Sequence, residues 1–234
     1  LAYQHFFVNS KKNIPLDIRK NIGQFIQHIS TNFTQEKDFF YPIRTFIPSG
    51  VLPQHYQDRI IDPYEEKAFL KKISNLGEKI RIMITKERTS ETFVQALKTN
   101  LQKMTNKILV EEVDLQSFRD RLSSGDYEFA LFAYIGNYPD PDGFLDSIRD
   151  NNFPGVNVDS KSLFANIDQI RHESEPIERV RKYAQAIRQF EDQWTVLPLY
   201  QMKLPYVVAN NINIKKTKYR YESEFWNFLW EKQE

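Results

Sequence analysis

The sequence predicts an α/β fold with a mostly parallel central sheet flanked by helices. Residues 79–85, 107–113 and 127–135 carry the alternating or continuous apolar patterns that are typical of strands. Between them, residues 90–104 repeat apolar side chains at helical spacing, and Asp114 is expected to cap a short helix that runs through Leu122. Strands that alternate with helices of this length favour right-handed crossovers and parallel pairing. The segment 127–135 is apolar at nearly every position, as expected of a strand that is covered on both faces.

The region before this unit combines regular and irregular segments. Residues 3–9 are aromatic and β-branched and predict a strand, after which Asp17 is the expected N-cap of a helix. Residues 30–62 hold several prolines and scattered aromatic residues, which indicates a long irregular segment whose aromatic side chains are buried. Residues 64–75 predict a helix, with Gly77 as its C-terminal cap.

The region after residue 135 is expected to begin with a Pro-Asp turn at 139–142. Pro176 suits the first position of a later helix. The expected elements are helices at 144–149, 160–172 and 176–193, strands at 196–201 and 206–209, and an aromatic tail at 215–233.

Composition and charge exclude several classes of function. The chain has 234 residues, with 32 Lys and Arg against 31 Asp and Glu, so its formal net charge is +1. A general nucleic-acid-binding protein carries a basic field, which this balance does not supply. The basic cluster at 215–220 is typical of a solvated turn, and we expect no nucleic acid to bind here. Cysteine is absent, which excludes disulfides, thiol nucleophiles and cysteine zinc sites.

Motifs for catalysis and metal binding are missing from the sequence. There is no HExxH, GxSxG, Walker A or GxGxxG pattern, and the four histidines are dispersed. Asp140 and Asp142 beside Gly143 superficially resemble a calcium loop, but Tyr138 would then occupy the first ligand position. We therefore predict that the protein is not an enzyme and that it uses no catalytic residue, metal or cofactor.

The segment 132–145 is the strongest candidate for a binding site. It leaves the carboxyl end of the apolar strand, which is where open α/β sheets bind ligands. Its residues offer aromatic stacking faces, an amide and backbone groups, which suit a peptide-like ligand. A well-packed turn with buried aromatic residues explains the same pattern equally well. The candidate ligand-binding residues are Tyr134, Ile135, Gly136, Asn137, Tyr138 and Asp140.

Four segments resemble one known family. The segment YEFALFAYIGNYPDPDGFL, residues 127–145, resembles a signature of the peptide-binding proteins of ABC importers, the oligopeptide/dipeptide/nickel-binding group. The segments HFFVNSKKNIPLDIRKNIGQFI, IPSGVLP and ERVRKYAQAIRQFEDQWTVLPLY are similar to other parts of these proteins, in the same order. The group is also known as bacterial extracellular solute-binding protein family 5.

This resemblance implies a lobe of the type II periplasmic-binding-protein-like fold. Residues 1–10 would be a hinge-type strand containing the hinge residue Asn9, and 11–205 the C-terminal ligand-binding lobe. Residues 206–234 would form a return strand and tail, with the N-terminal lobe and a signal peptide upstream of this chain. The implied function is binding of a peptide-like solute for an ABC permease. The implied protein is a monomer outside the cytoplasm, either periplasmic or a cell-surface lipoprotein.

Two residues depart from the family pattern. Tyr134 stands where the family has tryptophan, and Asn137 where it has the acidic residue that pairs with a peptide's free amino group. A neutral amide does not supply that charge-assisted bond, so a blocked, cyclic or non-peptide ligand, or a substitute acidic residue, is an open alternative. A second alternative is the ligand-sensing domain of a transcriptional regulator that is built on the same fold.

Overall fold

A computed structural model describes most of the chain up to residue 202 and two short segments beyond it. The described residues are 2–32, 40–47, 51–57, 61–86, 90–135, 140–145, 149, 161–202, 212–215 and 229–232. The strands are β1 (Ala2–Val8), β2 (Phe40–Pro42), β3 (Ile80–Thr85), β4 (Ile108–Val113), β5 (Phe129–Ile135), β6 (Val196–Met202), β7 (Ile212–Lys215) and β8 (Leu229–Lys232). The helices are α1 (Leu16–Asn32), α2 (Gln54–Gln57), α3 (Glu66–Ser74), α4 (Glu91–Met104), α5 (Leu115–Ser124), α6 (Pro141–Leu145), α7 (Lys161–Ile170) and α8 (Pro176–Glu191).

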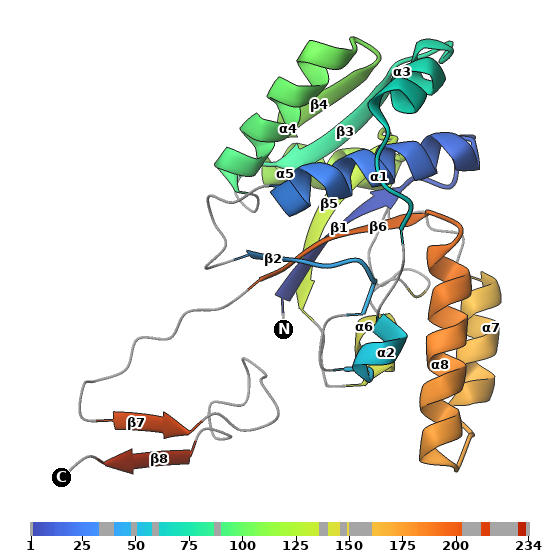
Figure 1. The fold of residues 1–234 in the computed structure, drawn as a ribbon, viewed down its shortest axis with the longest axis vertical. Helices are drawn as coiled ribbons and strands as arrows, with labels where there is room; N and C mark the ends of the chain where they lie inside the picture. Colours follow the sequence, from blue (N-terminus) through green and yellow to red (C-terminus); the bar gives the residue numbers. More distant parts are fainter. Residues whose placement is uncertain are drawn as a thin grey trace.

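The central sheet has six strands in the order β2-β6-β1-β5-β3-β4 (Figure 1). β3 pairs in parallel with both β4 and β5, as the alternation of strands and helices predicts. β1 instead lies between β5 and β6 and runs antiparallel to both, and β2 is antiparallel to β6. The α/β prediction is therefore confirmed, but the sheet is mixed. The expectation of a mostly parallel sheet applies to the β3–β5 unit.

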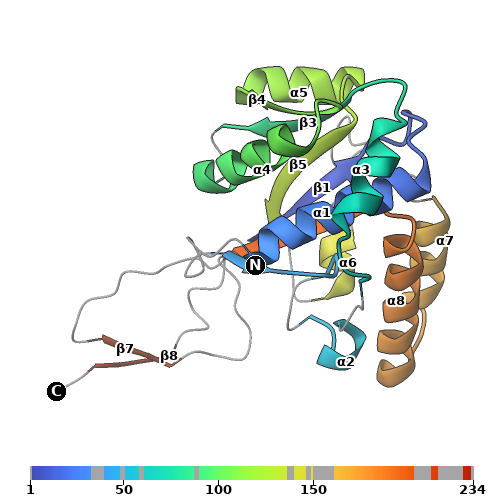
Figure 2. The same cartoon turned by 45° about the horizontal axis from the view of Figure 1, so that its top comes forward.

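Apolar side chains cover both faces of the sheet. Phe6 and Val8 of β1 pack in one core with residues of α1, α3 and α4, whereas Phe7 packs in a second core with α6, α7 and α8. This division follows from the alternation of side chains along a strand. A third, smaller cluster packs Phe118 and Leu122 of α5 against the sheet. Figure 2 shows α7 and α8 side by side as a helical hairpin.

Local sequence signals explain several helix ends. The Asp114 carboxylate accepts the N–H of Ser117 at 2.9 Å and caps α5, as predicted. Gly125 ends the same helix in the left-handed conformation, with a φ of 73° that glycine adopts without a steric penalty. Two other predictions were wrong. Asp17 lies within the first turn of α1, and Asn75 caps α3, so Gly77 is not the cap.

The region 30–62 was expected to be irregular, and its described parts contain the end of α1 and the short elements β2 and α2. Phe46 is fully buried, and its N–H donates to the carboxylate of the buried Glu191 in α8 at 2.5 Å. Tyr56 offers its carbonyl to the Arg188 guanidinium at 3.3 Å. The α8 helix therefore holds this segment in place.

β7 and β8 pair with each other as a separate antiparallel two-stranded sheet. The strand expected at 206–209 lies outside the described residues, as does the basic cluster from residue 216 onward. Among the described helices, none combines the length and apolar character that crossing a membrane requires.

Candidate functional site

The candidate segment leaves the sheet at an edge where four strand ends meet. Ala2, at the start of β1, pairs with Ile135 at the end of β5 and with Met202 at the end of β6. Phe40, at the start of β2, also pairs with Met202. The chain therefore enters β1 and leaves β6 side by side, next to the end of β5 (Figure 1). We call this the β5–β6 edge.

The structure places part of the predicted site at this edge. The backbones of Tyr134 and Ile135 belong to β5, where Tyr134 pairs with Tyr3. Gly136, Asn137 and Tyr138 lie outside the described residues, so their role in binding stays a prediction. The sequence correctly predicts that this strand ends at Ile135.

Asp140 marks the point where the described chain resumes. Its carboxylate accepts the N–H of Asp142 at 3.1 Å, and its carbonyl accepts the N–H of Gly143 at 3.0 Å. The second carboxylate oxygen pairs with Arg179 of α8 at 3.0 Å. Asp140 thus lies immediately before α6. The helix that was expected at 144–149 starts earlier, at Pro141. The role of Asp140 as a ligand-binding residue remains a prediction.

Asp142 lies deeper, with only 9% of its side chain exposed. Its carboxylate accepts a hydrogen bond from Nε of Arg171 at 2.8 Å. Arg171 also contacts Asp168 of α7 at 3.2 Å, and Asp168 pairs with Arg149. Desolvation by burial raises the pKa of Tyr183, and the neighbouring charge of Asp142 raises this pKa further.

Sequence reasoning missed the partners of these aspartates. Arg171 follows α7, and Arg179 and Tyr183 lie on α8, at least 29 positions from Asp142 along the chain. Arg179 and Tyr183 are four residues apart, a spacing that puts them on one face of a helix. That spacing identifies a shared face, but no local pattern connects it to the Pro-Asp turn. Only the tertiary fold brings them together.

Asn9 lies at the other end of β1 from Ala2 and is fully buried. Its side-chain amide donates to the carbonyls of Gly125 and Tyr127, both at 3.0 Å, and its oxygen accepts the N–H of Lys11 at 3.1 Å. These bonds fasten the end of β1 to the turn that leads into β5. A hinge role for Asn9 concerns a longer protein and stays a prediction.

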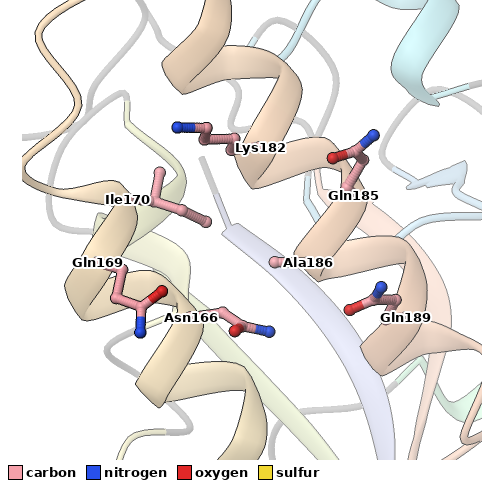
Figure 3. Close-up of a pocket in the computed structure, with 7 residues that line it drawn as sticks. All are labelled: Asn166, Gln169, Ile170, Lys182, Gln185, Ala186 and Gln189. Carbon is pink, nitrogen blue, oxygen red and sulfur yellow. The ribbon is translucent and has the colours of Figure 1, made fainter.

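A surface groove of about 270 Å³ runs between α7 and α8 (Figure 3). Its polar lining consists mostly of carboxamides together with Lys182, whose ammonium group pairs with Glu173. None of the predicted site residues lines this groove. The carboxamides come from Asn166, Gln169, Gln185 and Gln189. Within the described residues, no group of three or more His, Asp or Glu side chains is arranged to hold a metal ion.

The chain is similar in sequence or in fold to several known proteins. No family model matches the chain. The chain is 26% identical over 168 residues to di/tripeptide-binding protein 4 of Pseudomonas aeruginosa, an alignment that covers 67% of this chain and 31% of that protein. The periplasmic binding protein DppA of Helicobacter pylori, in complex with the peptide STSA, aligns with a TM-score of 0.68 and 17% identity. That match covers 86% of this chain and 41% of the other.

A further structural relative, NikA of Brucella suis in complex with Fe(III)-EDTA, aligns with a TM-score of 0.67 and 14% identity. It covers 86% of this chain and 45% of that chain. The chain thus spans about a third of its curated relative and less than half of each of these structures. The chain has the fold of one lobe of the extracytoplasmic solute-binding proteins of the oligopeptide/dipeptide/nickel-binding group.

Proposed function

We propose that this chain is the second lobe of a two-lobed solute-binding protein, which binds a peptide-like solute and delivers it to an ABC permease. The observation that carries the proposal is the pairing of Ala2 with both Ile135 and Met202. It brings the entry and the exit of the sheet to the same edge as the candidate segment. A ligand at this edge would lie between this lobe and a second one that connects to it before β1 and after β6.

The relatives support a peptide-like ligand. One is described as a di/tripeptide-binding protein, and another was crystallised with a peptide. NikA, which was crystallised with a metal chelate, shows that the fold alone does not define the ligand. We assign ligand contact to Tyr134, Ile135, Gly136, Asn137, Tyr138 and Asp140, and suggest that the backbone near Gly136 pairs with an extended ligand as an added strand.

The remaining parts of the proposal follow from a binding role. The relative DppA is described as a periplasmic binding protein, and we propose an extracytoplasmic location here, in the periplasm or as a cell-surface lipoprotein. Binding requires no turnover, so we propose no catalytic residue and no cofactor. The partner is an ABC permease, and the receptor acts as a monomer. None of the relatives named above is described as a transcriptional regulator, so no observation favours that alternative.

Native mass spectrometry of the longer protein, isolated from its own cells, tests the proposal. We expect a processed N-terminus and non-covalently bound masses in the range of short peptides. Denaturation of the same sample should release the bound molecules. Their fragmentation in the mass spectrometer then identifies them. An unprocessed protein that carries an additional basic domain and no solute would contradict the transport function and support the regulator.

A further inference from the structure

We propose that Arg171 and Arg179 are positioning residues that brace the ligand segment of this lobe against the α7–α8 hairpin. The inference rests on the proposed function, because it assigns to two arginines a role in holding the binding segment. Neither arginine belongs to the predicted site. Arg179 contacts Asp140, the last residue of that site, and Arg171 contacts Asp142 in α6.

The ligand segment is fixed at its upstream end by the sheet. Ile135 is held in register opposite Ala2 of β1. The downstream end lies outside the sheet, in α6, which is only five residues long and packs Phe144 and Leu145 in the second core. Short helices are weak on their own, since few of their backbone groups find partners within the helix. The position of Asp140 therefore depends on contacts from elsewhere.

Two ion pairs supply these contacts. Arg179 reaches Asp140 at 3.0 Å, and Arg171 reaches Asp142 at 2.8 Å. Exposed ion pairs contribute little, because water and salt screen them. Here 9% of the Asp142 side chain and 27% of the Asp140 side chain are exposed, against 31% for Arg171 and 35% for Arg179. Screening is correspondingly weaker, and the hydrogen bond from a charged donor is stronger than a neutral one.

Tyr183 joins the two pairs into one cluster. The Arg179 guanidinium lies over the Tyr183 ring, 5.1 Å from its centre, which restricts where the arginine can point. The hydroxyl end of the same tyrosine is close enough to Asp142 to be influenced by its charge. Tyr183 is itself 1% exposed and packed in the core of this face. The cluster is thus anchored in the core of the lobe, and the anchoring reaches Asp140, the residue before α6.

Amide hydrogen exchange in this chain tests the brace without a ligand. The reporter is the Gly143 N–H, which donates to the Asp140 backbone carbonyl and so remains available when the Asp140 side chain is changed. We expect Arg179→Gln and Arg171→Gln to speed its exchange by about tenfold or more, as for a local opening. The Val8 N–H, bonded to the carbonyl of Thr195, should stay protected.

Arg181→Gln is the matched control. Arg181 lies on the same helix, but its ion pair with Glu178 stays within α8. Exchange of the Gly143 N–H that rises no more in the two test variants than in this control would overturn the brace. If Arg179→Gln unfolds the whole chain, the reversed pair Asp140→Arg with Arg179→Asp decides. We expect the reversed pair to protect the Gly143 N–H better than either single change, and equal or worse protection would overturn the proposal.

A second readout separates positioning from mere structure. In the longer protein, native mass spectrometry should show a several-fold lower occupancy by the co-purifying solute for Arg179→Gln, and wild-type occupancy for Arg181→Gln. Faster exchange with unchanged occupancy would show that the brace exists but does not position the site, which overturns the role assigned here. Absence of any solute in the wild type would count against the proposed function instead, and the exchange results would be unaffected.

Discussion

Gly23 of α1 lies directly against the indole ring of Trp194, the residue that turns the chain from α8 into β6. A Cβ atom on Gly23 would lie 2.5 Å from Cζ3 of that ring and 2.6 Å from Cε3. Trp194 is only 6% exposed and has a φ of 52°, a left-handed conformation that non-glycine residues rarely adopt. The ring therefore has little room to move away.

We predict that Gly23→Ala destabilises the protein by about 1–3 kcal/mol, the range for overpacking a well-packed core. The clash outweighs the gain of about 1 kcal/mol that alanine brings to a helix interior. Urea denaturation gives the free energy of unfolding. Gly77→Ala is the control, because nothing lies within 4 Å of a Cβ at that position. Equal stabilities for the two variants would contradict the close contact.

The sequence predicts which segments form strands and helices better than it predicts the order of the strands in the sheet. The βαβ unit from β3 to β5 and the cap by Asp114 follow from local patterns, and both are confirmed. The insertion of β1 between β5 and β6 does not follow from local patterns. It joins residues more than 120 positions apart, such as Phe6 and Leu131, and no local preference specifies such a pairing.

In the candidate site, too, local features follow from the sequence, whereas long-range contacts do not. Its strand end at Ile135 follows from an apolar run. The turn predicted at 139–142 begins outside the described residues, and from Pro141 onward the chain is in α6 instead. The contacts of Asp140 and Asp142 with Arg179 and Arg171 depend on how the α7–α8 hairpin packs. The prediction that Gly77 caps α3 is wrong because a glycine only favours a helix cap. The helix ends earlier, at Ser74, without a left-handed residue.

We predict that Asn9→Ala lowers stability by about 1–3 kcal/mol, because the carbonyls of Gly125 and Tyr127 lose their donor in a buried place. Asn9→Asp should cost more, since it sets a carboxylate against two carbonyl oxygens. Urea denaturation of both variants measures the order. Asn100→Ala, which removes a bond within α4 only, serves as the control. An Asn9→Ala variant as stable as that control would refute the role of Asn9 in fastening β1 to the turn before β5.

We predict that the burial of His5 makes the stability of the protein depend on pH. Burial lowers the pKa of His5 from 6.5 to about 3 in the folded protein. Between these values the unfolded chain binds a proton that the folded chain does not, so stability falls as the pH drops below 6.5. The slope from this residue approaches about 1.4 kcal/mol per pH unit. Chemical denaturation between pH 7 and 5 should give a shallower loss for His5→Gln, and parallel curves would exclude a buried neutral histidine.

Asn137 allows a test of what end of a ligand is recognised. We predict that Asn137→Asp in the longer protein tightens binding only of ligands with a free amino group, because a carboxylate supplies a charge-assisted bond to an ammonium group. Calorimetry with a tripeptide and its N-acetylated form compares the two cases. The same change in affinity for both forms would show that Asn137 does not face the amino end.

The most direct test of the central claim is calorimetric titration of the longer protein with its co-purified solute, before and after Tyr134→Ala. Tyr134 is the last residue but one of β5, at the β5–β6 edge, where the proposed cleft would lie. Loss of a central aromatic contact should weaken binding by about tenfold or more. Tyr134→Ala with the wild-type affinity would contradict the claim that this edge of the lobe binds the ligand.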